Sequence, residues 1–419
     1  MHLCVFEDDQ ADHFLPLVHT RAVYDLRIGI RTLLQALRES FGDPPTILHA
    51  RKQVASVTAL ENDLLVNRIP EGLGVLFVNG RWVVEEGHAL ERVRGAVNSS
   101  AARVFVQDDT VIAAWMPGAA TRMVESDAIG RASFGDAPEE ELSEVRLVHR
   151  LWSFQTELYD AIRRDFEIYT KGLYIYERPG VDIRDGAILS NGEQIYIGAG
   201  SVVRAGAVLN ADNGPIYIGE DAEIEELAVV KGPAFIGSQS VIMTGADIKG
   251  SSCGFWSKVG GQVVDSIIHS LSNKAHAGYL GNAYVGRWCN FGADTNASNV
   301  KNDYGEVCMY DAVTGDLERS GRQFLGLVMG DHSKSGINTM FTTGTVVGVS
   351  CNVYGADFQP RFIPSFSWGG PDEFTEYRMV KAVRVAEAVM HRRHRELSDA
   401  ERENLAAVFE ATRVEKVLR

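Results

Sequence analysis

The chain has 419 residues, of which 45% are hydrophobic and 23% charged, a composition typical of soluble globular proteins. Its formal net charge of −15 argues against a nucleic-acid partner, because phosphate backbones are bound by basic surfaces. The sequence shows no apolar run of about 18 residues and no signal-peptide start, so we expect a cytoplasmic protein without a membrane partner. Its 5 cysteines have no C-x-x-C spacing and are expected to be reduced thiols.

Apolar runs and helical stretches alternate in the first third of the chain. Three short apolar runs are expected to be strands: Leu3–Phe6, Thr46–Ala50 and Gly74–Gly80. Helical spacing of apolar residues extends over Val23–Leu37 and again over Leu151–Phe166. Strands that alternate with helices favour a parallel sheet with helical crossovers. We therefore predict an α/β domain that is joined to the rest of the chain by a bridging helix.

From about residue 180 the sequence changes to a six-residue repeat. Aliphatic residues recur at every sixth position: Ile218, Ile224, Val230, Ile236, Ile242 and Ile248. Neither an α-helix nor a single strand has a period of six. The repeat therefore predicts a β-solenoid of triangular cross-section, with three short strands in each coil of about eighteen residues.

A second column of the repeat follows near the C-terminus. Its members are Met329, Ser335, Phe341, Val347 and Val353. The polar stretch 301–324 lies between the two columns and is out of register, so we expect it to leave the solenoid.

The tail from about Asp372 has the spacing of helices. Ser398–Glu401 fits a capping box that opens the second of them. Because a solenoid exposes unpaired strand edges at its ends, we expect these helices to form a cap. The predicted domains are 1–175 for the α/β unit, 176–371 for the solenoid and 372–419 for the helical cap.

One polar segment, Asn273–Asn282, breaks the repeat and is the first candidate for chemistry. It places Lys274 and His276 together, and the Asn-containing stretch Trp288–Asn299 follows it. The inward side chains of a solenoid form its core, so a reaction needs outward side chains and loops.

This part of the chain resembles the bifunctional N-acetylglucosamine-1-phosphate uridylyltransferase/glucosamine-1-phosphate acetyltransferases. The similarity to their acetyltransferase domain lies in four runs: Lys274-Ala275-His276, Tyr279–Asn282, Asn290–Ala293 and Asn299. The family pattern has one more glycine before the histidine. Leu15–Arg21 and Gly330–Lys334 resemble a divergent branch of this family, which has a non-standard N-terminal sugar nucleotidyltransferase domain. The resemblance implies a left-handed parallel β-helix and a homotrimer.

The resemblance also implies roles for individual side chains. His276 corresponds to the general base that takes a proton from an amine as the amine attacks a thioester, a task that suits an imidazole. Tyr279 corresponds to a sugar-phosphate contact, and Asn290 and Asn299 to contacts with the amino sugar and acetyl-CoA. Lys274 is assigned to the same substrate-binding set. Each could instead be a turn residue, because solenoid corners favour residues that tolerate positive φ.

A second polar pair, His332 and Lys334, lies in a later corner of the solenoid. We interpret it as a contact for the phosphates or the pantetheine of acetyl-CoA, with a solvated corner as the alternative. A rival reading is a zinc site between subunits, as in β-helix carbonic anhydrases, formed by His269, His276 and His332. These histidines lack the tight spacing that such a site needs.

The N-terminal domain lacks the Gly-rich phosphate loop of ordinary nucleotidyltransferases. Arg21 and Arg27 are the candidates for nucleotide binding, as partners of phosphate groups, and the alternative is that both are surface arginines. The Mg²⁺ ion of a nucleotidyl-transfer step has no assigned ligand, and Asn79, Asp8 and Asp9 are the residues considered for it.

These features and the resemblance predict two reactions. One is acetyl transfer from acetyl-CoA to an amino-sugar 1-phosphate, and the other is nucleotidyl transfer from a nucleoside triphosphate to a sugar 1-phosphate. The product would be a nucleotide sugar such as UDP-N-acetylglucosamine. Two alternatives stay open: an acetyltransferase alone, and a non-catalytic nucleotide-sugar-binding scaffold with a degenerate N-terminal domain.

Overall fold

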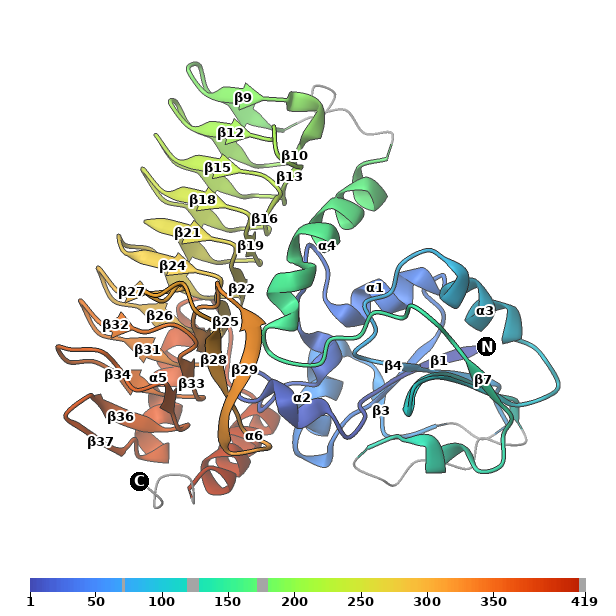
Figure 1. Ribbon diagram of the computed structural model, residues 1–419. Helices are drawn as coiled ribbons and strands as arrows, with labels where there is room; N and C mark the ends of the chain where they lie inside the picture. Colours follow the sequence, from blue (N-terminus) through green and yellow to red (C-terminus); the bar gives the residue numbers. More distant parts are fainter. Residues whose placement is uncertain (70–71, 119–127, 172–179, 414–419) are drawn as a thin grey trace.

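The computed structural model describes residues 1–69, 72–118, 128–171 and 180–413 (Figure 1). An α/β domain, a β-helix and two C-terminal helices follow one another along the chain. The predicted boundary at residue 175 falls outside the described residues, so the exact division into domains stays a prediction. Within the described ranges, no helix is both long and apolar enough to span a bilayer.

The N-terminal domain contains one mixed sheet of seven strands in the order β3-β2-β1-β4-β6-β5-β7. Its strands are β1 (His2–Phe6), β2 (Thr46–His49), β3 (Leu65–Val66), β4 (Val75–Asn79), β5 (Arg103–Gln107), β6 (Thr110–Met116) and β7 (Glu139–Glu141). The three predicted strands are β1, β2 and β4, and their parallel pairing is confirmed. The described residues of this domain include the α-helices α1 (Leu33–Ser40), α2 (Lys52–Asn62) and α3 (His88–Ala96).

The helix predicted over Val23–Leu37 is wrong in its first half. A short 3₁₀ turn, η2 (Val23–Asp25), comes first, and α1 begins only at Leu33, where Thr32 forms a capping box with Gln35. The intervening turn packs closely on α4 (Ser153–Thr170), the predicted bridging helix. A Cβ atom on Gly29 would lie 2.9 Å from Cβ of Ala161, so this approach requires glycine.

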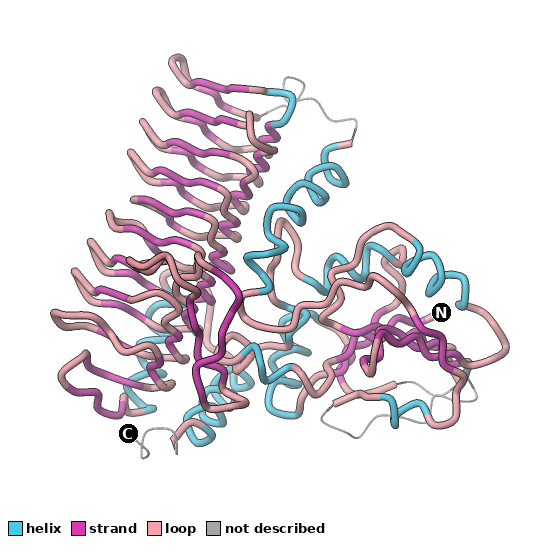
Figure 2. Tube along the Cα trace, viewed as in Figure 1, coloured by secondary structure: helices cyan, strands magenta, loops and turns pink. Residues whose placement is uncertain are grey.

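The β-helix has three parallel sheets, which Figure 2 shows stacked coil upon coil. The first contains β10 (Ile195–Ile197), β13 (Ile216–Ile218), β16 (Ala234–Ile236), β19 (Ser252–Cys253), β22 (Ile267–Ser270), β25 (Tyr284–Arg287), β30 (Val328–Met329), β33 (Val346–Val347) and β35 (Phe362–Ile363). The second contains β8 (Asp182–Ile183), β11 (Val202–Val203), β14 (Glu223–Ile224), β17 (Val241–Ile242), β20 (Lys258–Val259), β23 (Asn273–Lys274), β26 (Asn290–Phe291), β31 (Lys334–Ser335), β34 (Asn352–Val353), β36 (Ser367–Gly370) and the antiparallel edge strand β37 (Glu373–Glu376). The third contains β9 (Ile188–Ser190), β12 (Val208–Asn210), β15 (Val229–Lys231), β18 (Asp247–Lys249), β21 (Gln262–Val264), β24 (Tyr279–Gly281), β27 (Asn296–Ala297) and β32 (Met340–Phe341).

The six-residue column forms the core of this β-helix. Ile218 pairs with Ile236 and Ile224 pairs with Ile242, one coil apart in each case. All of these side chains are fully buried, because each points inward and stacks on its counterpart. The predicted fold class, an α/β domain followed by a left-handed parallel β-helix and C-terminal helices, is confirmed. The predicted excursion is the hairpin of β28 (Val307–Asp311) and β29 (Asp316–Arg322).

The N-terminal domain and the β-helix share one continuous core. Phe154 of α4 packs edge-to-face on Tyr284 of β25, with ring centroids 5.2 Å apart. The Tyr284 hydroxyl accepts a hydrogen bond from the Arg27 backbone N–H at 2.9 Å and donates one to the Arg27 carbonyl at 3.0 Å. Ser252 donates to the Gly29 carbonyl at 2.7 Å. The two domains are therefore joined through the turn that precedes α1.

The C-terminal helices α5 (Met379–His391) and α6 (Asp399–Ala411) lie beside the last coils (Figure 1). They pack on a row of corner residues that includes Leu271, Trp288 and Phe366. Asn404 of α6 also donates hydrogen bonds to the carbonyls of His19 and Gln53, at 3.0 and 3.1 Å. The tail thus bridges the β-helix to the N-terminal domain, a contact that the sequence did not predict.

Candidate functional site

Lys274, one of the predicted substrate-binding residues, occupies an inward position of the β-helix. It pairs in register with Val259, a core residue of the preceding coil, and is only 2% exposed. Its ammonium donates hydrogen bonds to the carbonyls of Gly260 at 2.9 Å and His276 at 2.7 Å. Burial lowers the pKa of Lys274 to about 8. In this chain the ammonium therefore fixes the turn that carries His276.

His276 is exposed at the tip of this turn. The turn is anchored on its far side, where the Asp294 N–H donates to the Ala277 carbonyl at 3.1 Å. Gly278 has φ +111, and a Cβ atom there would lie 2.2 Å from the Thr295 carbonyl oxygen. The imidazole is therefore presented to solvent by a turn that its neighbours hold in place.

The remaining predicted residues of this segment fall into two groups. Tyr279 and Asn299 lie together, since a Cβ on Gly281 would meet the Tyr279 hydroxyl at 2.3 Å and Asn299 Nδ2 at 2.7 Å. Asn299 also donates to Asn282 Oδ1 at 2.6 Å. Burial raises the pKa of Tyr279, which keeps its phenol protonated. Asn290 is exposed on a different sheet, in register with Asn273.

The His332 corner is covered, so its interpretation as a solvated corner is wrong. His332 is 8% exposed and lies parallel to Trp288, with ring centroids 6.3 Å apart. Burial lowers the pKa of His332 to about 3, so its ring is neutral. Lys334 donates to the His332 carbonyl at 2.8 Å, and burial lowers its pKa to about 8. The predicted contact of this pair with acetyl-CoA stays a prediction.

Arg21 and Arg27 lie in the contact between the two domains, so they are not surface arginines. Arg21 is 1% exposed and forms an ion pair with Asp331, which also accepts from the Thr20 hydroxyl at 2.9 Å. Arg27 donates from Nε to the His269 carbonyl at 3.2 Å, and burial lowers its pKa to about 10. Both guanidinium groups therefore serve the domain contact in this conformation.

The acidic residues at the carboxyl end of β1 do not fit a preformed metal site. Arg81 donates to Asp8 from Nε at 2.9 Å and from Nη2 at 2.6 Å, and Asn79 adds a third hydrogen bond at 2.8 Å. Arg51 pairs in the same way with Glu7. A Mg²⁺ ion prefers carboxylate oxygens that are free to bind it, and these are occupied by guanidinium groups. Of the three acidic residues Glu7, Asp8 and Asp9, only Asp9 is exposed.

Other residues do not supply such a site either. Across the described ranges, no group of three or more His, Cys, Asp and Glu side chains is arranged to hold a metal ion. His269, His276 and His332 differ in exposure, the first and last being buried. The expectation that the cysteines are reduced thiols agrees with the structure, which contains all 5 as free thiols.

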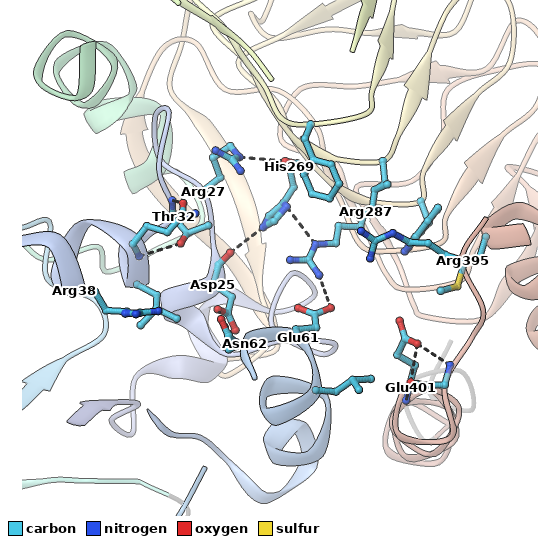
Figure 3. Close-up of a pocket in the computed structure, with 18 of the residues that line it drawn as sticks. Asp25, Arg27, Thr32, Arg38, Glu61, Asn62, His269, Arg287, Arg395 and Glu401 are labelled. Atoms are coloured by element: carbon cyan, nitrogen blue, oxygen red, sulfur yellow. Dashed lines mark hydrogen bonds and ion pairs between the residues drawn. The ribbon is translucent and has the colours of Figure 1, made fainter. Parts of the chain in front are cut away.

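A cleft of about 940 Å³ lies where the N-terminal domain, the β-helix and the tail meet (Figure 3). Its walls come from η2, α1, the end of α2, β22, β25 and the segment between α5 and α6. The residues around which it is built are Asp25, Arg27, Glu61, His269 and Arg287. Sequence reasoning named Arg27 and His269 but missed the others, because they come from elements far apart in the chain.

His269 organises one wall of this cleft. Its Nε2 donates to the Asp25 carbonyl at 2.8 Å, so its Nδ1 is the acceptor of the longer contact from Arg287 Nε at 3.4 Å. Burial together with the nearby arginines lowers the pKa of His269, and the ring is neutral. Arg287 is in turn paired with Glu61 (Figure 3).

Comparison with known proteins gives a family match for the N-terminal part of the chain and partial matches to curated relatives. Residues 3–173 match a family model described as sugar nucleotidyl transferase. The bifunctional sugar-1-phosphate nucleotidylyltransferase/acetyltransferase of Sulfurisphaera tokodaii is 33% identical over 93 residues, 22% of this chain and 23% of that protein. The bifunctional protein GlmU of Methanocaldococcus jannaschii is 31% identical over 118 residues, 28% of this chain and 26% of that protein. The resemblance predicted from the sequence is confirmed.

The sequence identity to these relatives is low, and the matches cover only part of this chain. The matched segments span about a quarter of the length of these curated relatives. The Sulfurisphaera tokodaii relative is named for both nucleotidyl transfer and acetyl transfer. Among solved structures, UDP-N-acetylglucosamine acyltransferase from Campylobacter jejuni aligns over 54% of this chain and 95% of its own, with 13% identity and a TM-score of 0.24.

Proposed function

We propose that this protein transfers an acetyl group from acetyl-CoA to the amine of an amino-sugar 1-phosphate at the His276 turn. The observation that carries this proposal is the position of Lys274 inside the β-helix. A buried ammonium that binds the His276 carbonyl holds the turn, while the imidazole stays exposed. The curated relatives named for acetyl transfer support the same reaction.

In the proposed reaction the amine nitrogen attacks the thioester carbonyl and forms an amide bond. His276 takes the proton that the nitrogen loses and so acts as the general base. The bond from the carbonyl carbon to sulfur breaks, and coenzyme A leaves as the thiol after it receives a proton. In this proposal Tyr279 contacts the sugar phosphate, and Asn290 and Asn299 contact the amino sugar and acetyl-CoA. We further propose a homotrimer, in which the exposed turn faces a neighbouring subunit.

The test is release of the free thiol from acetyl-CoA in the presence of glucosamine 1-phosphate. His276→Ala is expected to slow the release by about a hundred- to ten-thousandfold. His88→Ala, which changes another exposed histidine, should leave it intact. Turnover by His276→Ala at the rate of the unmodified protein would rule out the assigned base. Absence of turnover in the unmodified protein would reject the reaction itself.

For the N-terminal domain we propose activation of a sugar 1-phosphate by a nucleoside triphosphate, giving a nucleotide sugar such as UDP-N-acetylglucosamine. The match of residues 3–173 to the sugar nucleotidyl transferase model supports it. The pairing of Asp8 with Arg81 favours a second candidate, in which this domain binds a nucleotide sugar without transferring a nucleotide. Nucleotidyl transfer releases pyrophosphate, which added pyrophosphatase converts to phosphate. Phosphate release, measured with each nucleoside triphosphate and Mg²⁺, therefore distinguishes nucleotidyl transfer from binding of the nucleotide sugar alone.

A further inference from the structure

The cleft between the three parts of the molecule contains one carboxylate that is poorly satisfied. Asp25 is 5% exposed, and its Oδ2 atom has no hydrogen-bond partner in the part of the chain that the structure describes. Its other oxygen accepts a long hydrogen bond from Asn62 Nδ2 at 3.3 Å. A buried carboxylate with so few donors is costly, and such a group in a native protein calls for a partner.

The charges around Asp25 show what kind of partner is missing. Glu61 lies close enough to act on it, and burial together with Glu61 raises the pKa of Asp25 to about 7. Among the cations that lower the pKa of Asp25, Arg287 has the largest effect, and it is paired with Glu61. His269 is neutral, because burial lowers its pKa. Asp25 therefore acts on an arginine that is already paired with Glu61, and it forms no ion pair of its own in the described part of the chain.

Other cations of the cleft are committed elsewhere. Arg27 donates to the carbonyls of Ile30 and His269. Arg21, which also acts on the pKa of Asp25, forms an ion pair with Asp331. Arg38 is paired with Asp43 near the rim, at 2.7 Å. Arg395, a further arginine of the cleft, lies over the Phe255 ring. In the described part of the chain, none of these arginines forms an ion pair with Asp25.

We propose that this interdomain cleft binds a protonated primary amine on a small polar molecule, with the ammonium at Asp25 and Glu61. An ammonium is the compact cation with several donors that a pair of carboxylates accepts. The neighbouring wall residues Thr32, Gln35 and Asn62 offer hydrogen-bonding groups to a hydroxylated frame. The volume of about 940 Å³ accommodates a hexose with room to spare. This site is separate from the His276 turn and does not depend on acetyl transfer.

The test is calorimetric titration of the full chain with glucosamine, glucose and N-acetylglucosamine as probes. Glucose has a hydroxyl in place of the amine, and in N-acetylglucosamine the amine is a neutral amide. We expect glucosamine to bind roughly ten- to a hundredfold more tightly than either, the range of a charge-assisted hydrogen bond. Equal affinity for glucosamine and glucose would overturn the proposal, as would the absence of glucosamine binding.

Matched variants place the amine within the cleft. Asp25→Asn keeps the shape of the side chain and removes its charge, and Glu61→Gln removes the other carboxylate. Each is expected to reduce the affinity for glucosamine to that for glucose. Asp43→Asn removes an exposed carboxylate from the rim of the same cleft and should bind as the unmodified protein does.

Two further results would contradict the assignment. One is unchanged glucosamine affinity in Asp25→Asn. The other is loss of glucosamine binding in His276→Ala, which would place the ligand at the turn instead. The melting temperature of each variant shows whether it is folded. If Asp25→Asn does not fold, Glu61→Gln provides a second variant for the same test.

Discussion

Two corners of the β-helix each contain a lysine ammonium that is hydrogen-bonded to a histidine carbonyl, and they differ in what surrounds the histidine. At the first, Lys274 donates to the carbonyl of His276 at 2.7 Å, and at the second, Lys334 donates to the carbonyl of His332 at 2.8 Å. His276 is exposed, whereas His332 is 8% exposed and lies against Trp288. A hydrogen bond from lysine to a histidine carbonyl thus occurs both at an exposed imidazole and at a buried one.

The difference comes from the rest of the chain. The His332 corner is covered by the N-terminal domain, through the Arg21–Asp331 ion pair, and by Leu405 of α6. Within the described ranges, His276 is exposed and no hydrogen bond or ion pair joins it to the N-terminal domain or to α6. A histidine in a β-helix corner therefore becomes a candidate base only where no other domain covers it, and its exposure has to be known before a role is assigned.

The largest expected effect contrasts the two histidines directly. His276→Ala should lower the rate of acetyl transfer by about a hundred- to ten-thousandfold, the usual contribution of a general base, without changing the melting temperature. His332→Ala should instead lower the melting temperature, because it removes a buried ring from its contact with Trp288. Thiol release and differential scanning fluorimetry measure the two effects. A loss of rate without a loss of stability in His332→Ala would contradict this division.

The next largest effect is expected for the Arg21–Asp331 ion pair, which covers the His332 corner. Arg21→Met removes one partner of a buried ion pair and should cost about 3–5 kcal/mol of unfolding free energy, because Asp331 stays charged without its cation. The double variant Arg21→Met/Asp331→Asn removes both charges and should be more stable than the single variant. Urea denaturation gives both values. A single variant as stable as the double would show that the pair does not hold the domains together.

A smaller effect is expected for the lysine of the open corner. Lys274→Met removes a hydrogen-bonded cation, but it also removes a charge that burial penalises, so stability should change by no more than about 2 kcal/mol. The turn loses the donor to the His276 carbonyl, and kcat should fall roughly ten- to a hundredfold with an unchanged KM for acetyl-CoA. Lys249→Met, an exposed lysine of β18, is the control. A rise in KM alone would support the predicted substrate contact of Lys274.

The β-helix could be predicted because its signal is local. Each aliphatic residue of the repeat stacks on the residue one coil away. The six-residue spacing along the sequence therefore directly predicts which side chains stack in the core. The inward position of Lys274 could not be predicted in this way, because its coils are shortened. Ile242 pairs with Val259, 17 residues on, and Val259 pairs with Lys274, 15 residues on. Counting by six from Ile242 therefore does not reach Lys274.

The contact between the domains and the cleft could not be predicted for a different reason. Arg27 contacts His269, 242 residues away, and Arg287 pairs with Glu61, 226 residues away. No periodic pattern links such positions, since they meet only after both domains have folded and docked. The sequence therefore identified the His276 turn, which is local, and missed Asp25, whose surroundings come from three parts of the chain.

The smallest expected effect is a pH dependence of stability, which distinguishes the buried His332 from the exposed His276. Burial lowers the pKa of His332 from 6.5 to about 3, so the folded state resists protonation that the unfolded state accepts. The stability that His332 contributes is complete above pH 6.5 and is lost as the pH falls from 6.5 towards 3. At pH 5 this loss amounts to about 2 kcal/mol. His332→Gln should therefore lose less stability than the unmodified protein between pH 7.5 and pH 5. Equal losses, measured by urea denaturation at the two pH values, would show that His332 is protonated in the folded protein and that its corner is as open to solvent as that of His276.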